Sequence, residues 1–497
     1  MQLQFQKSTL QYLQEGMEEV KNTEVTQEIR LSEGMPDVGR ILGTWGQCLL
    51  RSKQWQADTI EVSGGVKTWT LYLPEDGTET RILESWLPFQ QRWEIRSGGR
   101  TGPIRILPLL RYTDSRSISA RKLMLRAGIG ILCQTYLPEE AEIFKALDLP
   151  EDMAVLQRQY PMLLPVEAGE KAFLLDEEES LPLSGGGWKI VMGTLNPEVT
   201  EQRIVNNKLA FKGNGNLQLL CRNGDGQMKS VKLELPFSQL AELERDYDPR
   251  SKGDLCLAVT DLETDLQDSG QIRIKCGLVC QYLIDEEKQL EIVEDAYSPG
   301  RQVKPEFRQL QLPVVLESRW ERIPVEHRIP GQSGQVLACS FQQDHPRQRQ
   351  GMEEVHLELS GQMQILFQDE AGFMQCSAGR WETDRVIPMD NSCTMSAQNP
   401  VITQIQPMED GSIGLCGTMH LRERTYNHCS IPMIAGIEYS EIRQEDEKRP
   451  SLILRRCGER SLWEIAKECG STVEAICRAN GLEGEPVKDR MLLIPTV

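Results

Sequence analysis

Apolar and polar residues alternate along most of the chain, and a period of two is the pattern of half-buried β-strands. Three stretches repeat one order of elements: an alternating strand, a turn, and a second strand that ends in Leu-Pro-Phe or Ile-Pro-Met. They are residues 58–90, 207–239 and 353–390. In each stretch a turn glycine follows an aromatic residue or a cysteine by five positions, and these glycines are Gly77, Gly226 and Gly372. The pattern therefore predicts three related β-hairpins.

The similarity extends beyond the hairpins and predicts an internal repeat of about 148 residues. Residues 124–144 match residues 271–293. A proline follows the last apolar residue of each hairpin, which predicts that strand pairing ends there, at a sheet edge. Two glycine-rich runs, 184–187 and 212–216, are interpreted as further hairpin turns.

A repeat of this length is too long for a solenoid and long enough to hold its own core. We therefore expect a mainly β protein with three bead-like antiparallel β-sandwich domains and a small module after them. The expected boundaries are 1–21 for an N-terminal segment, 22–160, 161–305 and 306–440 for the sandwich-like domains, 441–451 for a charged linker, and 452–497 for the module. In the N-terminal segment, five apolar residues are spaced to form one face of a short helix: Leu3, Leu10, Leu13, Met17 and Val20.

The module at the end has a helical pattern. Two Ser-x-x-Glu capping boxes predict two helix starts, at Ser461 with Glu464 and at Ser471 with Glu474. Asn480-Gly481 predicts a left-handed stop after the second helix. The expected apolar faces are Leu462, Ile465, Ala466 and Cys469 on the first helix, and Val473, Ile476 and Cys477 on the second. Strands expected at 452–456 and 491–495 make the order of elements β-α-α-β.

The chain has 497 residues and a formal net charge of -19. This acidic balance argues against nucleic acid and anionic membrane surfaces as the main partners. The N-terminus lacks the apolar core of a signal peptide, and no apolar stretch is long enough to predict a membrane span. Without a secretion signal, the fourteen cysteines indicate reduced thiols in a cytosol.

The sequence holds no pattern that predicts catalysis or metal binding. It has no Gly-x-Ser-x-Gly and no His-Glu-x-x-His motif. None of the five histidines has zinc-finger spacing to a pair of cysteines. We therefore expect no catalytic residues, no metal and no cofactor, in a protein that is not an enzyme.

Residues 28–47 (EIRLSEGMPDVGRILGTWGQ) and 63–77 (SGGVKTWTLYLPEDG) resemble the SPOCS domain, also catalogued as DUF3794. That domain occurs in tandem, often before a C-terminal LysM module, in spore-forming Firmicutes. Residues 461–482 (SLWEIAKECGSTVEAICRANGL) are similar to the helical core of LysM modules. The arrangement resembles that of SipL-like and SpoVID-like spore coat assembly proteins. The resemblance implies three SPOCS domains followed by a LysM domain.

LysM modules generally bind N-acetylglucosamine polymers in a groove between the loop before the first helix and the loop before the last strand. The resemblance assigns eight residues to a partner-binding or glycan-binding site: Glu459, Arg460, Ser461, Leu462, Trp463, Ile465, Asp489 and Arg490. Glu459-Arg460-Ser461 stands where the family usually has Gly-Asp-Thr, and Asp489-Arg490 stands where it usually has Gly-Gln. Side chains at the glycine positions obstruct the approach of a sugar, and four charges suit a protein surface better than a neutral glycan. We therefore favour protein binding over glycan binding.

Trp463 has two interpretations, a platform for a sugar ring or a packed core residue. The resemblance implies a non-enzymatic scaffold or adaptor in spore coat assembly. Its LysM domain would dock a morphogenetic ATPase similar to stage IV sporulation protein A, alongside other coat proteins, in the mother-cell cytoplasm at the forespore surface. The alternative is a protein that binds peptidoglycan or N-acetylglucosamine in the cell wall or the spore cortex.

Overall fold

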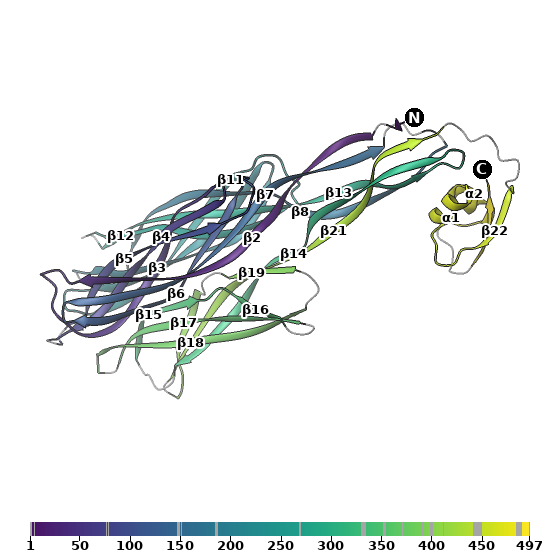
Figure 1. Cartoon of the computed structure of the whole chain (residues 1–497). Helices are drawn as coiled ribbons and strands as arrows, with labels where there is room; N and C mark the ends of the chain where they lie inside the picture. Colours follow the sequence, from purple (N-terminus) through teal and green to yellow (C-terminus); the bar gives the residue numbers. More distant parts are fainter. Residues whose placement is uncertain are drawn as a thin grey trace.

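The computed structural model of the chain is mainly β, as the alternating pattern predicts, with two short helices near the C-terminus (Figure 1). The predicted turn at 184–187 and the predicted linker at 441–451 lie mostly outside the residues that the structure describes. Those residues are 2–3, 5–75, 77, 79–146, 150, 152–183, 187–267, 270–329, 334–350, 354–369, 371–388, 392–397, 401–410, 412–440, 450–483 and 490–496.

The first unit of the body is a sandwich of two three-stranded antiparallel sheets, with strand orders β3-β4-β5 and β2-β7-β6. One apolar core joins the two sheets and includes Val62 and Val66 of one sheet with Leu125 and Ile129 of the other. The strands are β2 (Phe5–Arg30), β3 (Val38–Gln56), β4 (Thr59–Pro74), β5 (Arg81–Glu94), β6 (Ile104–Ser119) and β7 (Lys122–Ala146).

The second unit repeats this arrangement, with strand orders β11-β10-β9 and β12-β13-β8. Its core again joins both sheets, for example through Leu219 of one and Leu278 of the other. The strands are β8 (Ala154–Ser180), β9 (Lys189–Val205), β10 (Lys208–Arg222), β11 (Met228–Glu242), β12 (Lys252–Leu266) and β13 (Gln271–Tyr297).

The third unit also has two sheets, but shorter strands divide them. In one sheet, β15, β16 and β18 pair with β17, and in the other, β14, β19, β20 and the N-terminal β1 pair with β21. The strands are β1 (Gln2–Leu3), β14 (Val303–Ile329), β15 (Gln335–Gln343), β16 (Arg347–Gln350), β17 (Glu354–Gln368), β18 (Met374–Pro388), β19 (Ser392–Ala397), β20 (Val401–Pro407) and β21 (Ile413–Tyr439).

The three predicted hairpins are confirmed. They are formed by β4 with β5, β10 with β11, and β17 with β18. At their turns, Gly77, Gly226 and Gly372 have φ angles of 70°, 83° and 85°. This left-handed region is open to glycine and costly for residues with a Cβ atom.

Strand pairing does not end at the prolines of the first two hairpins, contrary to prediction. Pro88 lies within β5 and Pro236 within β11, and both strands continue to pair beyond them. Both are edge strands, where a missing N–H group does not interrupt the ladder. In the third hairpin, β18 is described as far as Pro388 and the next three residues lie outside the described ones, so the prediction is not tested there.

The glycine-rich run around Gly213 is not a turn either, because it lies inside β10. A Cβ atom on Gly213 would lie 2.5 Å from the ring of Phe237 in the neighbouring β11. The first unit repeats the relationship, since a Cβ atom on Gly64 would lie 2.6 Å from the ring of Phe89. Glycine is needed at these positions because the Cβ atom would also collide with a backbone carbonyl oxygen of the other neighbouring strand, that of Glu198 in β9 or Leu49 in β3.

The prediction of a short helix in residues 1–21 is wrong, because these residues form β1 and most of β2. The spacing of Leu10 and Leu13 suggested a helical face. In the structure these side chains belong to two separate apolar clusters, and both are buried. A strand covered on both faces loses the simple alternation of apolar and polar residues, which explains the error.

The three units are joined by a stalk, which we define as the ends of the strand pairs β2–β7, β8–β13 and β14–β21 farthest from the sandwiches. These six strands have 25 to 27 residues each, so they are about 80–90 Å long. Figure 1 shows them running out of the body toward the C-terminal module. One apolar cluster draws on all three pairs and includes Phe144, Ile292 and Leu312. Each unit therefore has a core of its own, and the shared cluster packs the three units against one another instead of leaving them as separate beads.

Buried charges also connect the units. Asp254 of the second unit accepts hydrogen bonds from Arg105 of the first, at 2.7 Å, and from the indole of Trp320 of the third, at 3.2 Å. Arg422 of the third unit forms an ion pair with the same carboxylate. Burial alone would raise the pKa of Asp254, but Arg105 and Arg422 outweigh it and hold that pKa well below its usual range. One carboxylate thus contacts all three units.

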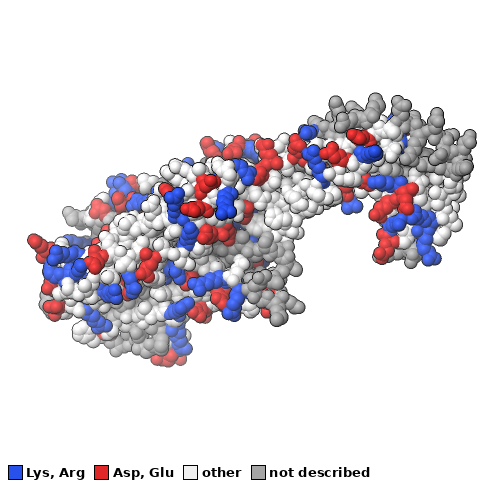
Figure 2. Space-filling view, in the orientation of Figure 1, with Lys and Arg blue, Asp and Glu red and all other residues white. Residues whose placement is uncertain are grey.

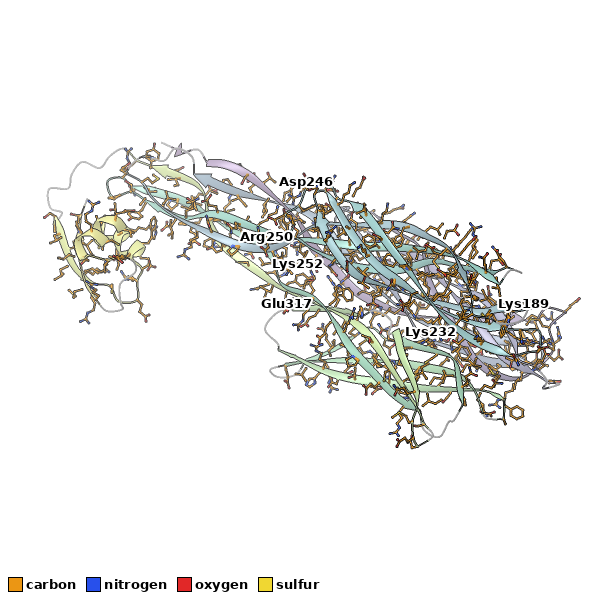
Figure 3. The ribbon with its side chains drawn as sticks, turned by 180° about the vertical axis from the view of Figure 1, so that it is seen from behind. Lys189, Lys232, Asp246, Arg250, Lys252 and Glu317 are labelled. Atoms are coloured by element: carbon orange, nitrogen blue, oxygen red, sulfur yellow. The ribbon has the colours of Figure 1, made fainter. Side chains whose placement is uncertain are left out.

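A second ionic cluster lies nearby. Arg424 of the third unit donates to Asp285 of the second, at 2.7 Å, and to Glu15 of the first, at 3.0 Å. Burial raises the pKa of Glu15 to about 7, against the opposing effect of Arg424. Seen from behind, Lys252 and Glu317 mark the region where the second and third units meet (Figure 3). A buried charge is costly without its partner, so the ion pairs of Asp254 and Arg424 fix how the units sit together.

Candidate functional site in the C-terminal module

The C-terminal module has the predicted order of elements: β22 (Leu452–Arg456), α1 (Leu462–Cys469), α2 (Val473–Asn480) and β23 (Met491–Pro495). The two strands pair with each other. The capping box of Ser461 and Glu464 is confirmed at the start of α1. After α2, Gly481 has the predicted left-handed conformation, with φ of 59°.

The second predicted capping box is wrong. The N-cap of α2 is Thr472, whose hydroxyl accepts a hydrogen bond from the Ala475 N–H group at 3.1 Å. The hydroxyl of Ser471 instead donates to the Pro495 carbonyl at the end of β23. Two adjacent hydroxyl residues can both cap a helix, and contact with β23 decides between them.

The module has a small apolar core, and two predicted site residues belong to it. Leu462 is 2% exposed and Ile465 is fully buried. They therefore cannot contact a partner or a glycan, and their place in the predicted site is wrong. The core also contains Ala466, Ile476, Leu492 and Ile494, with Cys469, Val473 and Cys477 partly buried against it.

Trp463 lies between the module and the stalk. Its ring meets the ring of Tyr297, at the end of β13, edge to face with centroids 4.8 Å apart. Its indole N–H donates to Asp295 of the same strand at 2.8 Å. The indole is thus neither an open sugar platform nor solely part of the module's own core.

Two further contacts hold the module to the stalk. The ammonium group of Lys467 lies 2.7 Å from Asp295. The hydroxyl of Tyr297 donates to the Ser471 carbonyl at 3.0 Å. Burial raises the pKa of Tyr297 to about 12, so this hydroxyl stays protonated as a donor at neutral pH.

Sequence reasoning missed Asp295 and Tyr297, because they lie far from the module in the chain. Both come at the end of a long strand of the second unit. A carboxylate and an aromatic residue at a strand end are common on protein surfaces, so the sequence contained no signal that distinguished them.

The predicted loop residues have different surroundings. Arg460 forms an ion pair with Glu468, which also contacts Arg455 at 3.0 Å. The hydrogen bond from Arg455 is the main cause that lowers the pKa of Glu468. Arg490 is exposed and donates to the Asn480 carbonyl at 3.4 Å.

The remaining predicted site residues are Glu459, Ser461 and Asp489. Glu459 is exposed at the start of the loop before α1. Ser461 caps α1, and its backbone N–H donates to the Glu464 carboxylate at 2.9 Å. Asp489 lies outside the described residues. The structure therefore places Glu459, Arg460 and Arg490 on the surface of the module.

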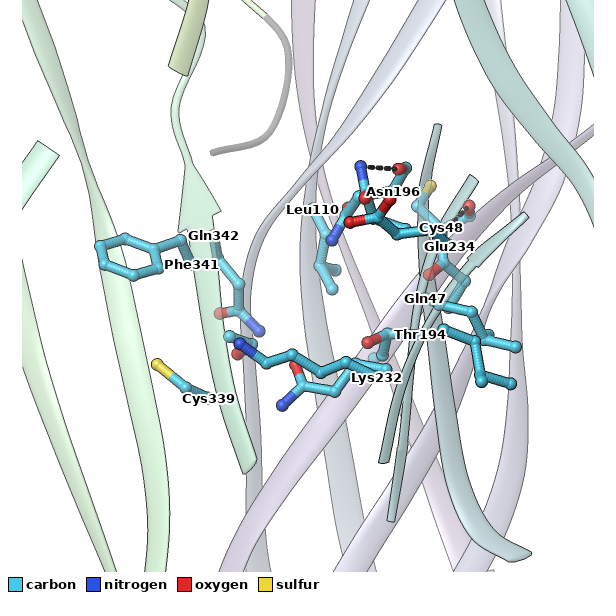
Figure 4. A pocket seen from close by; sticks show the side chains of 16 residues that line it. Gln47, Cys48, Leu110, Thr194, Asn196, Lys232, Glu234, Cys339, Phe341 and Gln342 are labelled. Atoms are coloured by element: carbon cyan, nitrogen blue, oxygen red, sulfur yellow. Dashed lines mark hydrogen bonds between the residues drawn. The ribbon is translucent and has the colours of Figure 1, made fainter. Parts of the chain in front are cut away.

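A cavity of about 330 Å³ lies where the three units of the body meet (Figure 4). Its lining is rich in amide and hydroxyl side chains and includes the charged residues Lys232 and Glu234. Two of its amides connect units: Gln47 accepts from the Leu195 N–H group at 2.9 Å, and Gln342 donates to the Thr113 hydroxyl at 3.1 Å. The cavity is part of the junction between units.

Among the described residues, no group of three or more His, Cys, Asp or Glu side chains is arranged to hold a metal ion. Neither of their two helices has the length and apolar character that crossing a membrane requires. Acidic and basic side chains are interspersed over the body, stalk and module on the face in view (Figure 2). Comparisons of the chain with protein-family models, curated proteins and solved structures find no match.

Proposed function

We propose that the chain is a non-enzymatic scaffold or adaptor in spore coat assembly, composed of three tandem SPOCS domains and a LysM domain. The resemblance of residues 28–47, 63–77 and 461–482 to those domains is the basis of this proposal. The β-α-α-β order of the module and the repeated two-sheet units are compatible with it. The terminal module docks the protein partner, and the elongated body provides surface for further coat proteins.

The observation that carries protein docking is the position of Trp463. Its ring packs on Tyr297 and its indole N–H group is bonded to Asp295, so the aromatic residue best suited to stack on a sugar is already engaged. The exposed loop residues that remain, Arg460 and Arg490 among them, carry charge. Exposed charges on a binding surface can be matched by opposite charges of a protein partner, and a neutral glycan offers no such charges. The glycan-binding alternative has less support for the same reason.

The expected partner is a morphogenetic ATPase similar to stage IV sporulation protein A. A module with modest affinity on a chain that makes other contacts gains avidity on a polymerised layer. The test is a pull-down of the purified ATPase with the full chain and with a chain that ends at residue 445. The docking role requires that the shorter chain retain much less ATPase, and equal retention would contradict it.

A further inference from the structure

The two-stranded sheet of the module has an apolar outer face. Leu452 and Leu454 of β22 are 52% and 63% exposed, and Met491 and Leu493 of β23 are 48% and 39% exposed. Leu454 lies directly opposite Leu493 in the pair. Four large apolar side chains thus share the face of the sheet that points away from the core of the module. Such a concentration on so small a surface is typical of an interaction site.

One edge of this sheet is closed by a side chain. The Asn480 amide donates to the Leu493 carbonyl at 2.6 Å, and its oxygen accepts from the Leu493 N–H group at 2.8 Å. An amide side chain can satisfy a peptide group in both directions. Asn480 therefore occupies the position that a third strand beside β23 would need.

The other edge of the sheet, along β22, directs backbone hydrogen-bonding groups outward. Two backbone hydrogen bonds show which residues at the ends of β22 face the partner strand. Cys457 N–H donates to the Arg490 carbonyl at 2.9 Å, and Thr496 N–H donates to the Ser451 carbonyl at 3.2 Å. In an antiparallel pair, alternate residues direct their backbone groups toward the partner strand and away from it. Leu452, Leu454 and Arg456 therefore direct their N–H and C=O groups away from β23, toward the outer edge. The side chains of Leu452, Leu454 and Arg456 lie on the outer face of the sheet.

Positive charge lies at one end of this edge. Arg456 is exposed at the end of β22, and Arg490 is exposed just before β23, at the same end of the sheet. The nearby carboxylate of Glu468 is already paired with Arg455 and Arg460. A segment that lies along β22 would meet apolar side chains first and guanidinium groups at its end.

We propose that β22 is a docking edge, to which an extended segment of a partner protein adds as a third strand. The segment has apolar side chains at alternate positions, which pack beside Leu452 and Leu454, and a carboxylate that faces Arg456. Backbone hydrogen bonds provide affinity in this mode, and alternate side chains provide specificity. The inference rests on the proposed function, because it names the surface through which the module docks a protein.

A second copy of this chain fits the edge less well. Two β22 strands paired antiparallel about Leu454 would bring each Arg456 opposite a Leu452. The guanidinium groups would then gain no carboxylate. An acidic, alternating segment of another protein satisfies both features of the edge.

The test uses the full chain and a phage-displayed library of random decapeptides. Selected peptides should show apolar residues at alternate positions with Asp or Glu near one end. Leu454→Pro removes the one outward N–H group at the centre of β22 without touching a bond to β23. It should weaken peptide binding by roughly tenfold or more. Leu452→Thr with Leu454→Thr, which keeps strand propensity and removes the apolar surface, should weaken it similarly.

Charge is tested by Arg456→Glu, with Arg478→Glu as the matched control, since Arg478 is an exposed residue of α2. The first should weaken binding of acidic peptides and the second should not. Circular dichroism verifies that each variant is folded. The proposal is overturned if selection yields no alternating peptides, or if they bind folded Leu454→Pro as well as the unchanged chain. It is also overturned if the chain dimerises through β22, seen as a dimer that Leu454→Pro converts to monomer.

The test of the docking edge and the test of the proposed function can fail independently. If the library test succeeds and the ATPase pull-down fails, the docking edge stands and the partner is a different protein. If the ATPase depends on the module but binds Leu454→Pro and the double threonine variant normally, the docking role stands and this edge is not its surface.

Discussion

Arg105 of the first unit donates to Asp254 of the second at 2.7 Å, and the two side chains are only 4% and 3% exposed. The third unit approaches the same carboxylate through Arg422 and Trp320. Removal of the negative charge therefore leaves two buried guanidinium groups without their shared partner.

Asp254→Asn should lower the free energy of unfolding by about 3–5 kcal/mol, the cost of an unpaired buried charge. Denaturant titration measures it. The matched control is Asp261→Asn, whose partner Arg51 is 3.2 Å away in an exposed pair, and its loss should cost less than about 1 kcal/mol. Equal effects of the two variants would show that the buried cluster stabilises the chain no more than an exposed ion pair between the same two units.

Glu15 should make stability depend on pH. Because burial raises its pKa in the folded state to about 7, from an ordinary value of 4.5, the folded chain binds a proton more tightly than the unfolded chain. The stabilising contribution is full below about pH 4.5 and is lost as the pH rises through 7. The free energy of unfolding of the original chain should therefore fall by about 2–3 kcal/mol between these pH values, and Glu15→Gln should not show this fall. Unfolding curves from pH 4.5 to 8 would show it, and parallel profiles for both proteins would contradict it.

His345 should make stability depend on pH in the opposite direction to Glu15. Its ring is buried, with Nε2 3.2 Å from the Gly130 carbonyl of the first unit, and burial lowers its pKa to about 4. The folded chain therefore loses stability as the pH falls from about 6.5 toward 4. His345→Gln should flatten the profile in that range. The measurement is the same titration, and a larger loss in the variant than in the original chain would refute the assignment.

Asp295→Ala should release the module from the stalk, because Asp295 accepts from both Trp463 and Lys467. Limited proteolysis between the stalk and the module should become faster, while unfolding of the body is unchanged. Glu287→Ala, an exposed residue of the same strand, is the control. Unchanged cleavage in Asp295→Ala would mean that other contacts suffice to seat the module.

The same variant separates the two interpretations of Trp463. If the indole were a sugar platform, Asp295→Ala would expose it and increase retention on purified cell wall, and N-acetylglucosamine oligomers would compete with that retention. We expect neither effect. Retention that increases in Asp295→Ala and is abolished in Trp463→Ala would favour glycan binding.

Gly213→Ala tests the glycine positions under aromatic rings. The added methyl group would lie 2.0 Å from the Glu198 carbonyl oxygen and 2.5 Å from the Phe237 ring, so the variant should lose about 1–3 kcal/mol. Gly224→Ala is the matched control, with no atom within 4 Å of the new Cβ. Thermal unfolding measures both.

Features set by neighbours in sequence could be predicted. The hairpins around Gly77, Gly226 and Gly372 depend on strand alternation and on one conformation that glycine favours, and both are visible in a short window. The cap of α1 at Ser461 is local in the same sense. The β-α-α-β order followed from such signals.

Features set by contact between distant segments could not be predicted. Leu10 and Leu13 have helix-like spacing because two different clusters cover the two faces of β2. Trp463 was ambiguous because its partners, Asp295 and Tyr297, come from another unit. Nothing in the sequence around Arg105 distinguished it from a surface arginine until packing placed it beside Asp254.

The pairing of β1 with β21 has a consequence for synthesis on the ribosome. Gln2 lies opposite Glu438, so the first strand must wait until nearly the whole body has been translated before it finds its place. The long strands of the first unit leave the ribosome with apolar side chains, such as Leu10 and Phe144, before the residues of the other two units that pack against them have been made. Such long-range closure slows folding and prolongs exposure to aggregation. A chain interrupted before residue 413 lacks β21 altogether, and we expect it to depend on chaperones far more than the finished protein does.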